Sequence, residues 1–258
     1  MNNITLLITK IILLLPFFTK EAQNVEPLKN EEAVSKIEYV VNTKLVFRNF
    51  DGNYSMYFNT KQSYFYNASL APEDTYVEDG NIVTAKEGDS DGFPIYKNLI
   101  TNEMQQKYGA GKAANKCIIA DKLTAIKWNI TKETKKISTF NTKKAVGDFG
   151  GRTYEVWFTT DIAVSNGPFK LQGLPGMILE AKSLDGKVTI SFKSYEQKSK
   201  GAVKKLSDFL KIPQFTHPEY LKKVEEAAKK RIIDAKAMGI DFTPPDPNND
   251  WQIEKKYL

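Results

Sequence analysis

Cysteine and histidine are nearly absent from this chain of 258 residues, in which Cys117 and His217 are the single examples of each. One cysteine cannot form an internal disulfide, and one histidine cannot supply a multi-histidine metal site or a facial triad. The isoleucines after Cys117 predict a buried structural thiol in a strand, and Pro218 after His217 predicts a helix start. We therefore expect no metal site, no cofactor and no catalytic residue.

Long hydrophobic runs are lacking as well. The apolar run Ile11–Phe18 is too short to span a bilayer, and no later segment approaches that length. Because Lys10 precedes this run, residues 1–22 resemble a secretory signal peptide. We expect an exported protein that is periplasmic, outer-membrane-associated or extracellular, with no transmembrane span in the mature chain and no nucleic acid as partner.

What is present fits a folded domain rather than a disordered chain. The sequence is 41% hydrophobic and 12% aromatic, with 37 basic and 31 acidic residues, which gives a formal net charge of +6. This length allows one substantial core. We expect residues 23–258 to form one domain, with a β-sheet over about 34–197, a helical segment over about 206–239 and an extended tail over 240–258.

The stretch from 69 to 92 is acidic and differs in composition from its surroundings. Its segment Glu87–Gly92 has a faint similarity to a calcium loop, but an oxygen ligand before the glycine and a later glutamate in register are missing. We interpret the stretch as a solvated loop and keep a weak calcium site as the alternative.

The strongest structural pattern is a hairpin around Asp185-Gly186. This dipeptide favours a two-residue type I′ turn, and the flanking residues alternate between apolar and polar. The turn would fix the register of the two strands. It pairs Ala181 with Ile190, Leu179 with Phe192, Lys182 with Thr189 and Glu180 with Ser191.

A second turn pattern lies just upstream, at Leu174-Pro175-Gly176-Met177. Proline followed by glycine is typical of a type II turn, and the glycines at 173 and 176 allow another backbone to approach closely. Turn geometry explains these residues, and the alternative is a binding role for the loop. The candidate binding residues are Gly173, Leu174, Pro175 and Gly176.

This region resembles the GLPGLI family of secreted proteins from Bacteroidetes-type bacteria. The motif stands here as Gly173-Leu174-Pro175-Gly176-Met177-Ile178, with methionine in place of the second leucine. The resemblance covers about residues 115–195, and the family often has cysteine where Thr142 stands and proline where Ala163 stands. It implies an exported protein of the cell envelope, with a hint of partnership with outer-membrane transport machinery. It implies no catalytic residues, because the family is biochemically uncharacterised. Its other features are Trp128, Lys135-Lys136-Ile137, Lys143-Lys144-Ala145, Trp157-Phe158-Thr159, Asp161-Ile162 and Gly167-Pro168-Phe169.

Two further segments receive definite predictions. Thr131–Lys136 is interpreted as a polar connection between strands, because it shows no alternation. A helix is predicted from His217-Pro218 to Gly239, with Thr216 or His217 as its cap. We expect its apolar stripe to pack on the sheet, with contact to an anionic surface or a partner as the alternative. The stripe consists of Leu221, Val224, Ala228, Ile232, Ala235 and Met238.

Together these patterns predict a mainly β (α+β) protein. We expect a curved antiparallel sheet of eight to ten strands, a partly closed barrel or half-barrel, with a C-terminal amphipathic helix. The expected function is non-enzymatic binding of a hydrophobic ligand or a partner protein of the envelope. One alternative is a structural or assembly partner of outer-membrane transport machinery with a packed core. A carboxylate-dependent hydrolase is a further alternative, although Glu155 and Glu180 are interpreted as outward-facing strand residues.

Overall fold

The computed structural model describes residues 34–45, 50–67, 74–78, 81–85, 94–108, 116–201, 203 and 205–240. The predicted signal peptide, the candidate calcium loop at 87–92 and the tail after 240 lie outside these residues. The described residues form fourteen strands and two helices. The strands of the large sheet are β1 (Val34–Thr43), β2 (Gly52–Phe58), β3 (Gln62–Asn67), β6 (Ile95–Asn98), β7 (Glu103–Tyr108), β8 (Cys117–Lys122), β9 (Trp128–Ile137), β10 (Phe140–Phe149), β11 (Arg152–Thr159), β12 (Met177–Ser183), β13 (Val188–Ser199) and β14 (Gln214–Thr216). A separate hairpin consists of β4 (Asp74–Glu78) and β5 (Asn81–Ala85).

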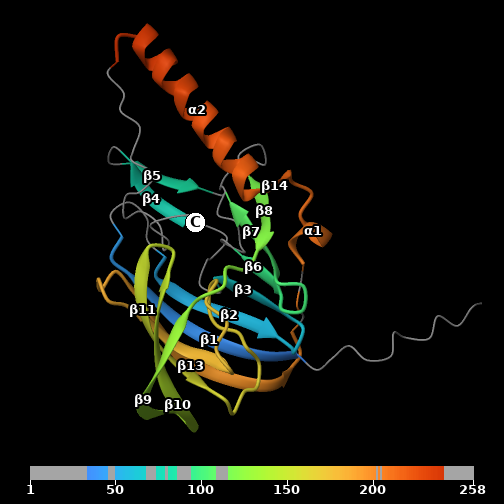
Figure 1. The fold of residues 1–258 in the computed structure, drawn as a ribbon. Helices are drawn as coiled ribbons and strands as arrows, with labels where there is room; N and C mark the ends of the chain where they lie inside the picture. The colour runs from blue at the N-terminus through green and yellow to red at the C-terminus, as the bar shows by residue number, and fades with distance from the viewer. Residues whose placement is uncertain are drawn as a thin grey trace, which may run out of the picture. The chain divides into compact units, whose positions relative to one another are not determined.

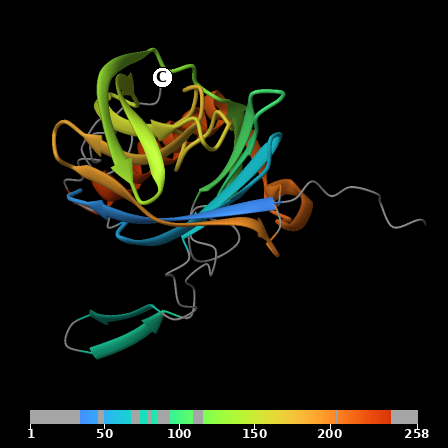
Figure 2. The ribbon, with the colours of Figure 1, turned by 90° about the horizontal axis from the view of Figure 1, so that it is seen from below.

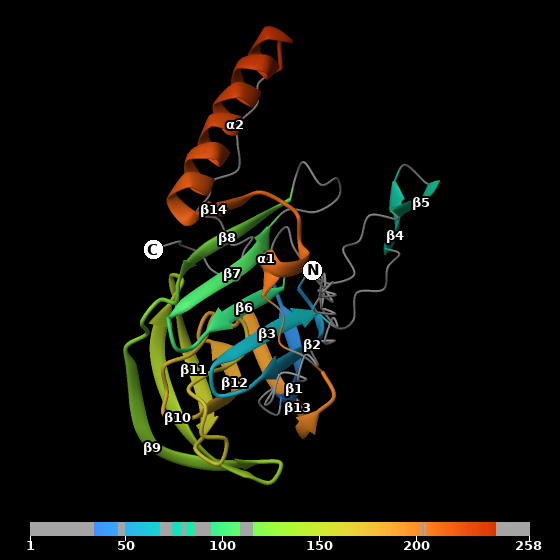
Figure 3. The same ribbon diagram turned by 90° about the vertical axis from the view of Figure 1, so that its right-hand side faces the viewer.

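Twelve strands form one curved sheet, in the order β14-β8-β7-β6-β3-β2-β1-β13-β12-β11-β10-β9. Every neighbouring pair is antiparallel except β14 and β8, which run parallel. Figures 1 and 3 show this order, and Figure 2 shows how the sheet curls around its interior. Among the described residues, no pairing joins the edge strands β9 and β14, so the sheet is not closed. The predicted mainly β class is confirmed, with more strands than expected.

The concave face of the sheet carries the main hydrophobic core. Side chains alternate along β1 and β11, so that Tyr39, Val41 and Val156 are buried while their neighbours are less so. The Tyr39 hydroxyl donates to the carbonyl of Ile178 at 2.9 Å, so this polar atom is satisfied inside the core. The connection between β11 and β12 contributes buried Leu174 and other apolar residues to the same core. The interior is therefore packed by the chain's own side chains at these positions.

A fully buried lysine joins the sheet to this connection. Lys97 on β6 donates from Nζ to Asn166 Oδ1 and to the Gly167 carbonyl, both at 2.8 Å, and to the Leu171 carbonyl at 3.2 Å. Three oxygens around one ammonium satisfy all of its donors. Burial nevertheless lowers the pKa of Lys97 to about 7. This lysine therefore fixes the β11–β12 connection at three points.

The β12–β13 hairpin has the predicted register but a different turn. Ala181 pairs with Ile190 and Lys182 with Thr189, as expected. The turn is closed by Gly186 N–H donating to the Ser183 carbonyl at 2.9 Å, and positive φ occurs at Gly186 but not at Asp185, so it is not type I′. Asp185 is held by Ser183 Oγ and by the Arg152 guanidinium of β11. The Arg152 contact comes from another strand, and together with the Ser183 hydroxyl at the start of the turn it explains why the preference of the dipeptide does not decide the geometry.

The predicted connection Thr131–Lys136 is wrong, because this segment lies inside β9. Strand β9 is an edge of the sheet and pairs on one side, with β10. Most of its side chains are exposed on both faces. An edge strand of this kind has no buried face to require apolar residues, so its sequence shows no alternation.

The C-terminal segment contains α1 (Leu206–Phe209) and α2 (His217–Ala237). Thr216 caps α2, and Glu219 completes a capping box, which confirms the predicted start. The expected packing of its apolar stripe on the sheet is wrong, because Leu221 and Val224 are 44% and 45% exposed. Within the sheet, α2 contacts β8 and β14, which are next to its first turn (Figure 1). The ring of Tyr220 on α2 also packs against Tyr108 of β7, with ring centres 5.3 Å apart. Within the described ranges, no helix is both long and apolar enough to cross a membrane.

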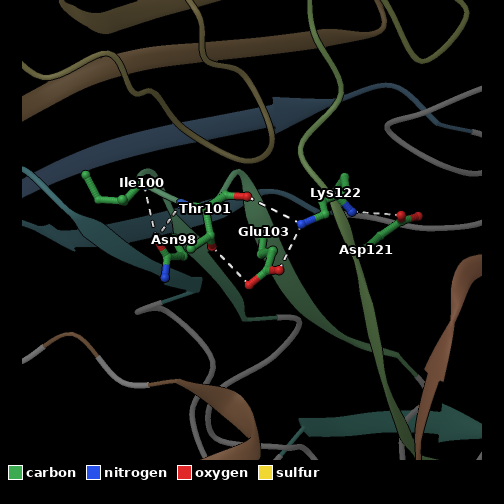
Figure 4. A network of polar contacts seen from close by, with 6 residues as sticks. All are labelled: Asn98, Ile100, Thr101, Glu103, Asp121 and Lys122. Carbon is green, nitrogen blue, oxygen red and sulfur yellow. Dashed lines mark hydrogen bonds and ion pairs between the residues drawn. The ribbon is translucent and has the colours of Figure 1, made fainter.

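A polar network fixes the turn between β6 and β7 (Figure 4). Asn98 Oδ1 accepts from the backbone N–H groups of Ile100 and Thr101 at 3.0 and 3.1 Å. Glu103 accepts from the Thr101 hydroxyl at 2.9 Å and from Lys122 Nζ of β8 at 2.8 Å. This exposed glutamate–lysine pair links the β6–β7 turn to β8.

Candidate functional site

Charged side chains surround one tryptophan on the outer face of β9 to β12. Trp157 on β11 lies opposite Glu180 on β12, and Glu155 lies opposite Lys182. Because side chains two apart share a face, Trp157, Glu155 and Glu180 all point outward. This confirms the interpretation of both glutamates as outward-facing. We call this group the Trp157 platform, and it consists of Trp157, Glu155, Glu180, Lys135 and Lys144.

Two lysines from neighbouring strands hold the carboxylates of the platform. Lys135 Nζ lies 2.6 Å from Glu180 Oε2 and 4.4 Å from the centre of the Trp157 ring. Lys144 Nζ lies 2.8 Å from Glu155 Oε2 and 3.2 Å from Glu133 Oε2. The hydrogen bond to Glu155 raises the pKa of Lys144, so this ammonium stays charged at neutral pH.

The register of the sheet is irregular next to the platform. One shift lies between Trp157 and Phe158 in the β11–β12 pair, and another lies between Lys143 and Ala145 in the β9–β10 pair. Bulges of this kind bend a strand and change where its side chains point. They occur here beside the residues that make up the platform, in the four strands that carry it.

A hollow of about 180 Å³ lies on the platform. It offers an indole surface, carboxylate acceptors, ammonium donors and the hydroxyls of Thr189 and Ser191. A carboxylate only accepts hydrogen bonds and an ammonium only donates them. The arrangement therefore suits a ligand with an apolar face and several hydroxyl or amide groups at its rim. The lining residues are Lys135, Glu155, Trp157, Glu180, Ala181, Lys182, Thr189, Ile190 and Ser191.

A larger cleft of about 390 Å³ also has Lys135 in its lining. We call it the lysine cleft, because three lysines and a single carboxylate line it. Its lining residues are Thr134, Lys135, Lys136, Asn141, Thr142, Lys143, Phe158, Thr160 and Asp161.

Another polar cleft, of about 410 Å³, lies near Glu103 and Lys122. Its lining includes Tyr96, which is 6% exposed and donates its hydroxyl to Gln62 Oε1 at 3.0 Å. This ring is therefore largely covered, whereas Trp157 is half-buried at the surface. We take the Trp157 platform as the candidate site for this reason.

The structure places the predicted binding loop against the sheet. Leu174 is 2% exposed, and a side chain at Gly176 would overlap the Thr159 carbonyl oxygen. The expected close backbone approach is therefore present. The expected type II turn is not, because Gly176 has φ +153° and its N–H donates to the Leu174 carbonyl at 2.7 Å. Gly173 and Pro175 are exposed, and a binding role for the loop stays a prediction.

Sequence reasoning identified the outward direction of Glu155 and Glu180 but missed their lysine partners. Lys135 falls in the segment that the sequence predicts as a connection, and Lys144 lies on a different strand, β10. The resemblance named both lysines without giving them a role. Only the order β9-β10-β11-β12 brings these residues together.

Comparison with solved structures shows the fold. A structure described as PNGF-II in a P21 space group matches with a TM-score of 0.53 and 19% identity, over 76% of this chain and 34% of that one. The same protein in a C2 space group matches with a TM-score of 0.51 and 19% identity, over 76% and 33% of the two chains. The present chain thus spans about a third of those proteins. No curated protein matches by sequence.

A family model described as "N-glycanase peptide, N-terminal domain" matches residues 76–215. This match corrects the expected function. The prediction of a non-enzymatic protein that binds a hydrophobic ligand or envelope partner is wrong, because the matched family is defined by an N-glycanase. A scarcity of histidine and cysteine does not exclude an enzyme, because carboxylates, lysines and tyrosines also act as catalytic groups. The match covers 140 of 258 residues, from 76 to 215 inclusive, and this chain therefore belongs to the family of N-glycanase N-terminal domains.

Proposed function

We propose that this chain serves an N-glycanase-type enzyme function, in which the Trp157 platform binds the saccharide of an N-linked glycan. The observation that carries the proposal is a half-buried indole flanked by two carboxylates and two ammonium groups on one sheet face. Family membership supplies the class of substrate.

The chemistry of a pyranose ring matches this arrangement. One face of the ring is lined with C–H groups and packs on an indole, while its hydroxyl and acetamido groups project from the edge. Tryptophan is suited to such contacts because it combines a large apolar surface with a polar edge. Glu155 and Glu180 would accept from the hydroxyls, and Lys144 would donate to sugar oxygens.

Lys135 covers part of the Trp157 ring and would move aside when a saccharide binds. Its side chain is 39% exposed, and that of its partner Glu180 is 30% exposed. An exposed ion pair is worth at most about 1 kcal/mol, and an exposed cation–π contact about the same. A stacked sugar can therefore displace the ammonium at a small cost in free energy.

The proposal assigns saccharide binding to these residues and does not place bond cleavage on them. A general acid must carry a proton that it can donate. Glu155 and Glu180 each accept a hydrogen bond from a lysine, so the platform offers acceptors at both positions.

The predicted export belongs to the same proposal, because N-linked glycans occur on exported proteins. The GLPGLI resemblance stays a prediction on which the family match does not bear.

The proposal is tested by titrating the 258-residue chain with a glycopeptide that carries one N-linked glycan. We expect Trp157→Ala to weaken binding by about tenfold, since a stacked ring contributes about 1 kcal/mol or more. Glu180→Gln should weaken it too, by loss of a charged acceptor. Isothermal titration calorimetry gives the affinity, and mass spectrometry of the peptide reports whether the glycan is released.

The matched control is Glu103→Gln, which removes the carboxylate of the exposed Glu103–Lys122 pair (Figure 4). This pair lies on β7 and β8, at the other end of the strand order from β9 to β12. This variant should bind the glycopeptide as the unaltered chain does. Equal affinity for the glycopeptide and for the same peptide without its glycan would refute the proposal.

A further inference from the structure

We propose that α2 binds an anionic lipid surface through its apolar stripe, with the cations at the borders of the stripe on the phosphates of the lipid head groups. This inference goes beyond the proposed function and does not depend on the Trp157 platform.

The exposure of the stripe is the first observation. Leu221 and Val224 are nearly half exposed, and Ile232 is 37% exposed. The contacts of α2 with the sheet involve its first turn, where His217 is buried and Tyr220 packs against a ring of β7. A surface helix of a globular protein usually buries such a stripe against the core. The stripe of α2 therefore keeps apolar surface that another phase or molecule can cover.

The charge of the C-terminal segment is the second observation. Residues 198–240 contain eleven lysine or arginine residues and five aspartate or glutamate residues, which gives this segment a formal charge of +6. The formal net charge of the whole chain is also +6. The excess of positive charge therefore lies in the segment that carries α2, and the remainder of the chain is balanced. A basic segment of this kind is attracted to the negative surface of a membrane with anionic lipids.

Helix geometry places cations at both borders of the stripe. At about 100° per residue, its five side chains within α2 fall within about 80° of arc. Lys236 lies beside one border and Arg231 beside the other, and among the described residues neither forms an ion pair. Glu225 also lies near the stripe, but it is paired with Lys229 at 2.6 Å. Because long basic side chains lie along apolar surface and extend their charge to polar groups, this pattern suits a helix in the plane of a membrane interface.

Charge also argues against a second copy of the chain as the occupant. Two stripes packed face to face would bring together two segments that each carry +6. Like charges repel, and the cations at the borders would be the closest of them. A lipid surface offers both an apolar layer for the stripe and phosphates beside it. The length of α2, 21 residues or about 31 Å, allows the whole stripe to lie along such a surface.

The test is co-sedimentation of the 258-residue chain with lipid vesicles. Vesicles of phosphatidylcholine and phosphatidylglycerol in equal amounts are compared with vesicles of phosphatidylcholine alone. We expect at least about tenfold tighter binding to the anionic vesicles, because each cation near such a surface contributes about fivefold. Salt at about 1 M shortens the reach of charges to about 3 Å and should remove most of this difference.

Two adjacent isoleucines provide a matched pair of variants. Ile232 lies in the stripe, whereas Ile233 lies outside it and is more exposed, at 67%. Ile232→Gln should weaken binding to the anionic vesicles by about fivefold, and Ile233→Gln should leave it unchanged. Glutamine favours the helix well enough to keep α2 intact, which circular dichroism verifies. Non-specific adhesion would follow exposure instead and would decrease more in Ile233→Gln.

The cations are tested in the same way. Arg231→Gln/Lys236→Gln removes the charges at the borders and should abolish most of the preference for anionic vesicles. The matched control Lys223→Gln/Lys230→Gln removes the same charge from the opposite side of α2 and should keep most of it.

Three results would overturn the inference. The first is absence of binding to the anionic vesicles, which would leave a protein partner as the occupant of the stripe. The second is equal affinity for neutral and anionic vesicles, or equal effects of the two variants in either matched pair. The third is a dimer in sedimentation velocity that Ile232→Gln dissociates, which would assign the stripe to a second copy of the chain.

Discussion

At the scale of single residues, backbone contacts decide which glycines are replaceable. Gly176 touches the end of β11, whereas a side chain at Gly186 would meet no atom within 4 Å. Both have positive φ, at +153° and +71°. The two positions therefore separate the cost of a strained backbone from the cost of steric overlap.

We predict that Gly176→Ala destabilises the fold much more than Gly186→Ala. A methyl group at 176 would overlap the Thr159 carbonyl oxygen, a backbone atom that cannot rotate away. Overpacking costs about 1–3 kcal/mol, and a strained φ about 1 kcal/mol. Urea unfolding should show Gly186→Ala losing about 1 kcal/mol and Gly176→Ala at least twice that. Similar losses would contradict the close approach.

Lys97 makes stability depend on pH. Its folded pKa is about 7, below the value near 10.5 that it has in an unfolded chain. Between these values the unfolded state binds more protons, so the free energy of unfolding rises with pH. The penalty for burying the charge is fully present below pH 7 and decreases as the pH rises toward 10.5.

We therefore predict that replacing Lys97 by methionine flattens this dependence. Between pH 7 and 9.5 the unaltered chain should gain stability, by at most about 1.4 kcal/mol per pH unit. The difference between the two proteins should shrink or reverse over that window. Urea unfolding at fixed ionic strength measures it, and Lys122→Met at an exposed ion pair is the control. A constant difference across the window would show that Lys97 keeps its proton.

At the scale of elements, the stability of α2 depends more on the capping of its N-terminus than on packing against the sheet. His217 is its single buried residue among those described, and its contacts with the sheet include β8, β14 and Tyr108 of β7. Most of the stability of a helix in a protein comes from tertiary packing of its apolar face, and on α2 that face is exposed. Its capping box at Thr216 and Glu219 is therefore expected to contribute much of its stability.

We predict that Thr216→Ala lowers the helical content with little effect on the sheet. Loss of an N-cap costs about 1 kcal/mol, which is large for a helix with few tertiary contacts. Circular dichroism at 222 nm should fall, while the near-ultraviolet signal of the buried aromatic residues stays unchanged. The control is Glu225→Gln, which removes an exposed i,i+4 pair with Lys229 and should change the helical content little. A cooperative loss of both signals would indicate that the helix and the sheet unfold together.

At the scale of the whole molecule, the sequence predicts those features that are set by contacts between residues close together in the chain. Alternation placed Ala181 opposite Ile190, and the sequence Thr-His-Pro marked the start of α2. The turn at Asp185 escaped prediction because Arg152, from another strand, holds it. Strand β9 was not predicted over Thr131–Lys136, because an edge strand with no buried face shows no alternation of apolar and polar residues. The site could not be predicted, since Lys135 and Glu180 become neighbours only through the strand order.

The unpaired edge of the sheet at β9 affects the tendency of the protein to aggregate. The outermost strand, β9, presents backbone N–H and C=O groups that could recruit another strand and start aggregation. Lysines 132, 135 and 136 lie along it. Positive charge on such a border repels a second copy of the same border, so these lysines discourage polymerisation through sheet extension. Neutralising them to study ligand recognition would therefore also reduce colloidal stability, and solubility should be measured alongside affinity.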